Sequence, residues 1–167
     1  MLLTGCFLRS VDEKWRVALP KPIRDALGEL SGVALYVAPG TDGSLVVYTE
    51  QSFLQLAEKV AQGPPTSEDV RAFSRLFYAQ AQRVEVDRQG RIRVPAELAA
   101  LALPGREIML LGVRDHLEIW DRQHWEAYLS EKQPYYDRLA ESAFGGPVRQ
   151  VAAAEVPSHA VQPRQPR

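Results

Sequence analysis

The chain has 167 residues, of which 46% are hydrophobic, so it can fill the core of one ordinary domain or of two small ones. Its net charge of −1 argues against a broadly basic surface for nucleic acid, although residues 1–24 hold five basic side chains against two acidic ones. Cys6 is the single cysteine, which excludes an intrachain disulfide, and the lack of a long apolar segment or of a basic, apolar leader predicts a cytoplasmic protein without a signal peptide.

The first predicted elements are a short strand and a short helix. Residues 16–19 alternate between arginine or alanine and apolar side chains, and this period of two is typical of a half-buried strand that carries arginine on its other face. Pro20 ends the strand and suits the first turn of a helix. We expect that helix over residues 21–27, because Gly28 provides its stop.

A hairpin and a helix are predicted next. The dipeptide Asp42-Gly43 is a strong turn signal, and it lies between the apolar runs 35–37 and 45–48, which we expect to be the two strands. Apolar residues at positions i, i+3, i+4 and i+7 between residues 53 and 60 then predict a helix along one face of which these side chains gather.

A linker and a second round of elements follow. The segment 62–65 breaks the helical pattern with Gln-Gly-Pro-Pro, and Thr66 or Ser67 can cap a helix whose apolar stripe runs from residue 70 to 77. Small and polar residues dominate from residue 145 onward, so this tail is predicted to be disordered. Between these segments we expect a strand at 91–94, a helix at 96–102, strands at 108–111 and 117–120, and a helix that begins near Trp125, is interrupted at Pro134 and continues from Tyr136.

The two halves are predicted to be copies of one unit. Residues 11–20 and 86–95 both read apolar, Asp, three residues, Arg, apolar, any residue, apolar, Pro, at an offset of 75. Residues 45–48 match 117–120 at an offset of 72, and an ordered series of such matches indicates duplication. A unit of about 50 residues buries only a marginal core, so the two copies are expected to pair within the chain.

Several runs of the sequence carry a resemblance to a known family. In combination, and over about residues 5–144, they resemble the MraZ family of transcriptional regulators. The runs are Asp-x-Lys-x-Arg-Val-x-Leu-Pro at 12–20 followed by Arg24, Asp-x-Gln-Gly-Arg-Ile-x-Val-Pro at 87–95, the hairpin segments at 42–48 and 111–120, and Arg-x-Phe-x-Arg-x-Phe at 71–77.

This resemblance implies a fold. The expected class is α+β and β-rich, with two tandem swapped-hairpin modules of the double-psi-like, SpoVT-AbrB type that form a pseudo-dimeric barrel with flanking helices. The expected boundaries are module 1 at residues 5–51, connecting helices and a linker at 52–80, module 2 at 81–124, a C-terminal helix at 125–144 and a disordered tail at 145–167.

The resemblance also implies a function. It predicts a sequence-specific regulator that assembles into a ring of subunits, binds direct repeats in the promoter of the division and cell wall gene cluster, and represses that cluster together with its own gene. Its partners would be double-stranded DNA and further copies of the chain, in the cytoplasm and at the nucleoid. No enzymatic activity, cofactor, metal, small-molecule substrate or membrane is expected.

The candidate site is a pair of Asp-x-x-x-Arg motifs. In the family this motif contacts DNA, and it falls on Asp12 with Arg16 and on Asp87 with Arg91. Arginine at the head of a strand can contact two phosphate oxygens, or O6 and N7 of guanine, and the aspartate can orient it across the turn. The full set of predicted DNA-binding residues is Arg9, Asp12, Lys14, Arg16, Lys21, Arg24, Asp87, Arg91 and Arg93.

One residue departs from the family pattern. The family pattern has glycine just before the first arginine; Gly90 keeps it in the second copy, whereas the first copy of this chain has Trp15. If that position needs a positive φ, tryptophan is strained there by roughly 1–2 kcal/mol. Either the first turn differs, or Trp15 contacts DNA or a neighbouring subunit.

Three alternatives stay open from the sequence. An aspartate and an arginine four positions apart often stabilise a hairpin turn without binding any ligand. The chain can also be the antitoxin of a toxin–antitoxin pair, which its two modules disfavour, or a ring scaffold for other proteins. His116, His124 and His159 show no metal-ligand spacing and are expected at the surface.

Overall fold

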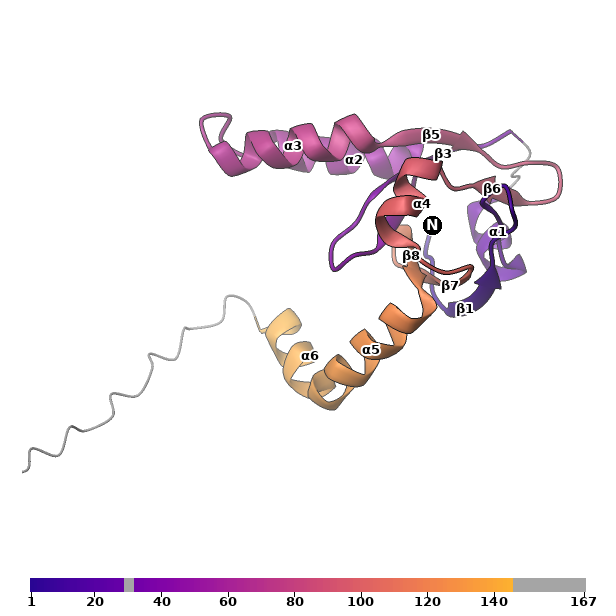
Figure 1. Ribbon diagram of the computed structural model, residues 1–167. Helices are drawn as coiled ribbons and strands as arrows, with labels where there is room; N and C mark the ends of the chain where they lie inside the picture. Colours follow the sequence, from indigo (N-terminus) through magenta and orange to yellow (C-terminus); the bar gives the residue numbers. More distant parts are fainter. Residues whose placement is uncertain (29–31, 146–167) are drawn as a thin grey trace, which may run out of the picture. The chain divides into compact units, whose positions relative to one another are not determined.

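Six strands form one antiparallel sheet in the computed structural model, which describes residues 1–28 and 32–145 (Figure 1). The order across the sheet is β1-β7-β8-β4-β3-β5, and each neighbouring pair is antiparallel. The strands are β1 (Cys6–Ser10), β3 (Ala34–Pro39), β4 (Leu45–Thr49), β5 (Gln82–Glu85), β7 (Glu107–Val113) and β8 (His116–Asp121).

The halves of the chain exchange their first strands. β1 of the first half pairs with β7 of the second, and β5 of the second half pairs with β3 of the first. Two further strands, β2 (Arg16–Ala18) and β6 (Arg91–Arg93), come one from each half and form a separate antiparallel pair, which we call the ribbon. This exchange confirms the α+β, swapped-hairpin fold, although β1 and β5 remain edges of the sheet, so hydrogen bonds do not close the barrel within the described residues.

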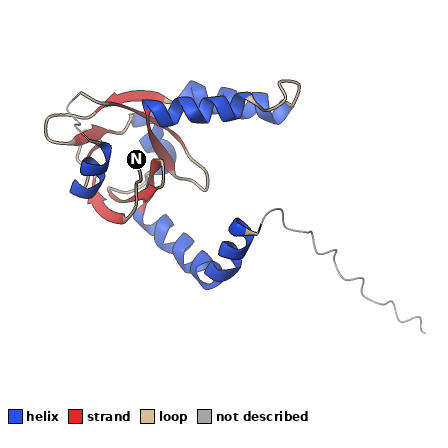
Figure 2. Cartoon of the chain, turned by 180° about the vertical axis from the view of Figure 1, so that it is seen from behind, coloured by secondary structure: helices blue, strands red, loops and turns tan. Residues whose placement is uncertain are grey.

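The helices begin at, or within three residues of, the positions that the sequence predicts. α1 (Lys21–Leu27) and α4 (Ala96–Ala102) follow Pro20 and Pro95 directly. The side chain of Thr49 caps α2 (Glu50–Ala61), and that of Ser67 caps α3 (Glu68–Gln80), each by accepting a backbone N–H three residues further on. The two views of Figures 1 and 2 show α2 and α3 side by side as a helical hairpin that extends from the sheet.

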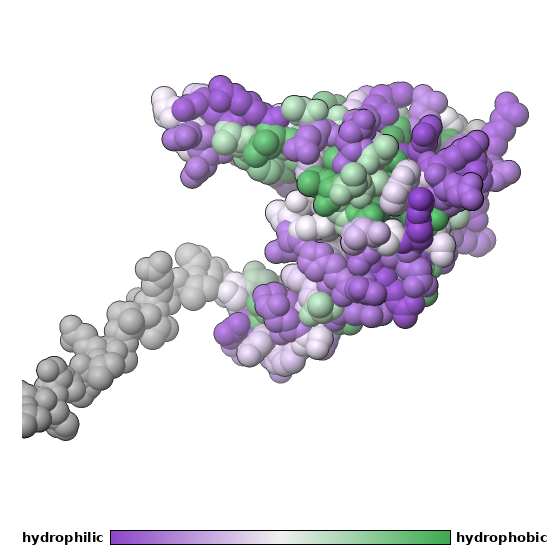
Figure 3. Space-filling view, in the orientation of Figure 1, coloured by the Kyte–Doolittle hydropathy of each residue, from purple (hydrophilic) through white to green (hydrophobic). Residues whose placement is uncertain are grey.

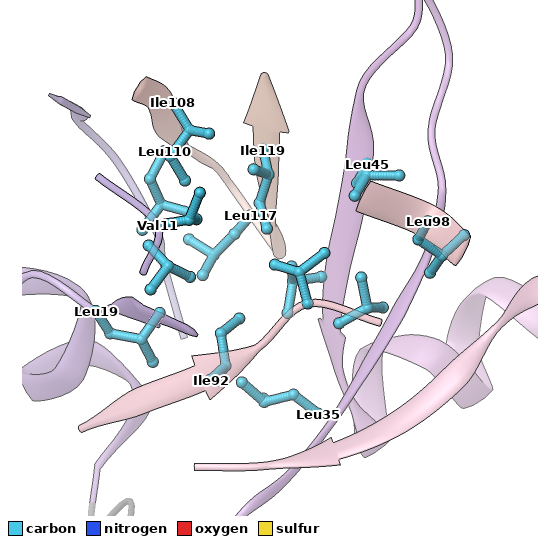
Figure 4. Close-up of a cluster of buried hydrophobic side chains, with 14 of the residues drawn as sticks. Val11, Leu19, Leu35, Leu45, Ile92, Leu98, Ile108, Leu110, Leu117 and Ile119 are labelled. Carbon is cyan, nitrogen blue, oxygen red and sulfur yellow. The ribbon is translucent and has the colours of Figure 1, made fainter. Parts of the chain in front are cut away.

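The main core lies between the sheet, the ribbon, α1 and α4 (Figure 4). Val17 and Ile92 enter it from the ribbon, Ile23 from α1 and Leu98 from α4, and each is only 1% exposed. Side chains alternate between the two faces of a strand, so Ala38 and Val46 lie on the opposite face of the sheet. There they form a smaller cluster with Phe77, stacked on the ring of Phe53, which joins the α2–α3 hairpin to the sheet.

The C-terminal helices follow the predicted interruption. α5 (Arg122–Lys132) comes directly after β8, a single 3-10 turn at Gln133–Tyr135 contains Pro134, and α6 (Tyr136–Phe144) follows. Residues 1–130 form one compact unit, and the described residues 131–145 belong to a separate one. The predicted tail lies outside the described residues from 146 on, and no helix of the described part is long and apolar enough to span a membrane.

Candidate nucleic-acid interface

The ribbon presents three arginines on its outer face. In an antiparallel pair, residues directly opposite each other point to the same side, and here Arg16 is opposite Arg93 while Ala18 is opposite Arg91. Their neighbours Val17 and Ile92 point the other way, into the core. The space-filling view shows a hydrophilic surface over the region of α1 and β6 (Figure 3).

A turn with a fixed hydrogen-bond pattern holds the first arginine. One oxygen of the Asp12 carboxylate accepts the backbone N–H groups of Lys14 and Arg16, both at 2.9 Å, and the other accepts Nε of Arg16 at 2.6 Å. The backbone N–H of Arg16, together with the guanidinium, lowers the pKa of Asp12. The carboxylate therefore stays ionised at neutral pH and orients the arginine.

The second turn repeats this geometry. Asp87 accepts the backbone N–H groups of Gln89 and Arg91 at 2.9 and 3.0 Å and Nε of Arg91 at 2.8 Å. The backbone N–H of Arg91 is again the largest cause of a lowered pKa, here that of Asp87. Both motifs therefore form ion pairs that stabilise their own turns.

The ion pairs leave part of each guanidinium open. Each aspartate binds the Nε edge, and within the described residues no hydrogen bond occupies the terminal Nη groups of Arg16 or Arg91. The side chains are 34% and 26% exposed. Arginine can bind a phosphate or a guanine edge through its terminal N–H groups, so a structural role and a binding role are compatible.

Trp15 adopts the conformation that glycine adopts in the other turn. Its φ is +58°, against +71° for Gly90, and both turns close with the same N–H to aspartate C=O bond at 2.9 Å. The possibility that the first turn differs is therefore wrong. The indole instead packs against the core and under Arg106 of the same chain, whose guanidinium carbon lies 4.2 Å from the ring centre.

The other basic candidates divide between the two turns. Lys14 is exposed in the first turn. Lys21 and Arg24 belong to α1 of the first half but lie beside the second turn, in a hollow that Asp87 and Gly90 also line. Lys21 is paired with Asp25 at 2.7 Å, and the stem of Arg24 lies over Gly90.

Two candidates lie apart from these turns. Arg9 is on β1 of the large sheet, half-buried, with its guanidinium against the Leu8 carbonyl and the Phe7 ring, and it makes no hydrogen bond to the ribbon within the described residues. Arg93 is exposed on the ribbon, and in the described part of the chain it has no carboxylate partner. Arg93 therefore lies on the same face of the ribbon as Arg16 and Arg91, whereas Arg9 lies on the large sheet and is not part of this group.

Two basic residues at the turns are not among those predicted from the sequence. Arg88 is exposed within the second turn, and Arg106, just before β7, donates from Nη1 to the carbonyl of Asp12 at 2.7 Å. Trp15 in place of glycine was the one available signal, since a half-buried aromatic ring at a turn needs a packing partner. The packing partner of Trp15 is Arg106, which is too far away in the sequence to be predicted from a local pattern.

The expectation for one histidine is wrong. The side chain of His116 is only 17% exposed, because it lies between Asp115 and Glu118 and against the ring of Tyr48. The hydrogen bond to Glu118 is the largest cause of a raised pKa of His116. His124 is exposed, His159 lies outside the described residues, and no group of three possible metal ligands occurs in the part that the structure describes.

The strand exchange and the two Asp–Arg turns define a tandem swapped-hairpin protein. A family model described as "MraZ protein, putative antitoxin-like" matches residues 2–76 and 77–144. The chain therefore belongs to the MraZ family.

Similar proteins extend over most of the chain. A protein from Finegoldia magna is 36% identical and covers 81% of this chain and 92% of its own length. A protein from Alkaliphilus oremlandii is 37% identical over 83% of this chain and 94% of its own length. A third from Heliobacterium modesticaldum is 36% identical over 84% and 95%. All three are named transcriptional regulator MraZ.

Proposed function

We propose that this chain is a DNA-binding transcription regulator without enzymatic activity, which acts in the cytoplasm at the nucleoid. The observation that carries the proposal is the outer face of the ribbon, where Arg16, Arg91 and Arg93 lie together above the buried hydrophobic core. Arg93 has no carboxylate partner in the described part of the chain, and the terminal Nη groups of Arg16 and Arg91 make no hydrogen bond there, so an anionic partner best explains this surface. The names of the relatives favour duplex DNA as that partner.

We further propose the operator and the assembly. The chain would bind direct repeats in the promoter of the division and cell wall gene cluster, including its own gene, and repress it as a ring of identical subunits. A net charge of −1 does not favour tight binding by one subunit. When several subunits each meet one repeat, the second contact is intramolecular and the affinity rises by about 10²–10⁴ without any new type of contact.

A gel-shift titration with the upstream region of the chain's own gene tests the site. We expect Arg16→Ala to weaken binding by about 5- to 150-fold, because a lost bidentate contact costs about 1–3 kcal/mol. Arg71→Ala is the matched control, since Arg71 bonds backbone carbonyls at the far end of the α2–α3 hairpin. No shift with the unmodified chain would favour the protein scaffold, and equal shifts for both variants would remove Arg16 from the site.

Sedimentation of the same samples tests the assembly. If avidity operates, protein that is diluted until rings dissociate should bind a promoter with several repeats far more weakly than intact rings do, although Arg16 is unchanged. Equal affinity of dissociated subunits and rings would show that assembly and DNA binding are not coupled.

A further inference from the structure

We propose that Arg106 is a phosphate-binding residue of the first turn and that Trp15 is the positioning residue that holds it there. This inference deepens the proposed function and rests on it. Nothing in the Asp-x-x-x-Arg pattern points to Arg106, which precedes β7 and is 94 positions from Asp12.

Two contacts fix the guanidinium of Arg106. Its carbon lies 4.2 Å from the centre of the Trp15 ring, a distance at which a cation is attracted to the face of an indole. Its Nη1 donates to the carbonyl of Asp12 at 2.7 Å. The side chain is exposed, and within the described residues its other N–H groups have no hydrogen-bond partner. The group is thus held in one orientation with donors free toward the solvent.

The surrounding charge favours an anion. Lys14, Arg16 and Arg106 line one open hollow at the first turn together with Val11, Asp12 and Glu13. The charge of Asp12 is already paired with that of Arg16 at 2.6 Å. Of the remaining three charged groups, Lys14 and Arg106 outweigh Glu13. Because the hollow adjoins the outer face of the ribbon, a backbone phosphate of a duplex on that face is the anion that fits it.

The second turn lacks this arrangement. Leu35 in β3 takes the place of Ile108 in β7, and the backbone bond from Val86 N–H to the Val33 carbonyl repeats that from Val11 to Arg106, so the counterpart of Arg106 is Val33. At Gly90 an added Cβ would lie 2.8 Å from Cδ of Arg24, so the space that the indole fills in the first turn is taken by an arginine stem. Tryptophan at a left-handed position therefore provides a platform for an arginine, and only the first turn has one.

Salt-dependent binding separates this role from a structural one. We would measure the affinity of the full chain for a duplex of its own upstream region and for an unrelated duplex of equal length, over a range of salt concentrations. Arg106→Ala should weaken binding to both duplexes by the same factor and lower the slope of log affinity against log salt by about 1 for each first turn engaged. Arg71→Ala, which also removes one positive charge and bonds to backbone carbonyls, should leave the slope unchanged.

The role of Trp15 is tested by a double-mutant comparison. Glycine takes a positive φ without strain, so Trp15→Gly keeps the conformation of the turn while it removes the platform together with the packing of the indole on the core. Thermal unfolding is therefore measured alongside, and binding is compared at a temperature at which the variant is folded. Trp15→Gly should weaken binding in the same way as Arg106→Ala, and the double variant should be no weaker than the single ones. Arg106→Gln, which removes the charge but keeps a donor for the Asp12 carbonyl, replaces Arg106→Ala if thermal unfolding shows that the alanine variant does not fold.

The outcomes distinguish this inference from the proposed function. If Arg16→Ala loses binding while Arg106→Ala and Arg106→Gln match Arg71→Ala in slope, Arg106 does not bind phosphate and the regulator stands. Additive effects of Trp15→Gly and Arg106→Ala would contradict the positioning role. Failure of the unmodified chain to bind either duplex at low salt would overturn both proposals.

Discussion

The two halves of the chain contain the same turn but cover it differently. Asp12 and Asp87 accept equivalent hydrogen bonds, yet Trp15 stands in one turn where Gly90 stands in the other. Arg106 of the second half covers the first turn, and Arg24 of the first half covers the second. The comparison teaches that the aspartate determines the backbone of the turn, whereas the residue before the arginine is free to vary if a side chain from the other half packs on it.

The hairpins of the two halves differ as well. Asp42 and Gly43 turn the first one, both at positive φ. In the second, Arg114 alone has a positive φ, and His116 beyond it lies between two carboxylates. The turn of the first hairpin thus depends on two residues that tolerate a positive φ. The second hairpin also contains a titratable group, His116, which is hydrogen-bonded to Asp115 and Glu118.

The largest loss of stability should come from a substitution in the hydrophobic core beneath the ribbon, which both turns share. Ile92 is 1% exposed beneath the ribbon, and Ile92→Ala should lower the free energy of unfolding by about 2–5 kcal/mol because it leaves a cavity. Urea unfolding measures this change. Leu101→Ala on α4, where the side chain is 61% exposed, is the control and should change stability by less than about 0.5 kcal/mol. Equal effects of the two would show that the ribbon does not cover a common core.

Substitutions at the left-handed position of each turn should change the free energy of unfolding by a smaller amount, and they compare the backbone strain of the two turns. Gly90→Ala places a Cβ at φ +71° and should cost about 1–2 kcal/mol of unfolding free energy. At the matching position, Trp15→Gly should be more stable than Trp15→Ala by a similar amount, about 1 kcal/mol, because glycine has no Cβ penalty at φ +58°. Urea unfolding of all three variants tests this, and a cost at residue 90 without a difference at residue 15 would show that the turns are not alike.

The smallest effect should be a pH dependence confined to the second hairpin. Glu118 and Asp115 raise the pKa of His116 above its usual 6.5, so the folded state holds that proton more tightly than the unfolded chain does. The network therefore adds its full stabilisation below pH 6.5 and loses it as the pH rises through the raised pKa. His116→Gln should flatten this part of a stability profile measured by urea unfolding from acidic to alkaline pH. His124→Gln, at an exposed histidine, should retain it.

Most of the local structure follows from the sequence, but the pairing does not. Pro20, Pro95 and Asp42-Gly43 mark helix starts and a turn because their backbone preferences act locally. Alternation along 16–19 shows which side chains are buried, but a strand with one apolar face can pair with any other such strand. The exchange of β1 and β5 was therefore expected only from the family resemblance. The module boundaries at residues 51 and 81 stay predictions.

The candidate site divides in the same way. The period of two places Arg16 and Arg91 on the outer face, and both lie there. The position of Arg24 over the opposite turn and that of Arg106 on Trp15 depend on contacts between segments far apart in the chain. No local preference encodes such contacts, so no pattern of spacing could reveal them.

The exchange of first strands has a consequence for synthesis on the ribosome. Leu8 of β1 pairs with Met109 of β7, so the N-terminal strand has no partner until nearly the whole sheet-forming part has been translated. Closing so long a loop is entropically costly and slow compared with forming a local hairpin. The nascent first half must therefore remain soluble with an open β3 edge, and a chain that is cut in the 62–65 linker should yield two fragments that fold only in each other's presence.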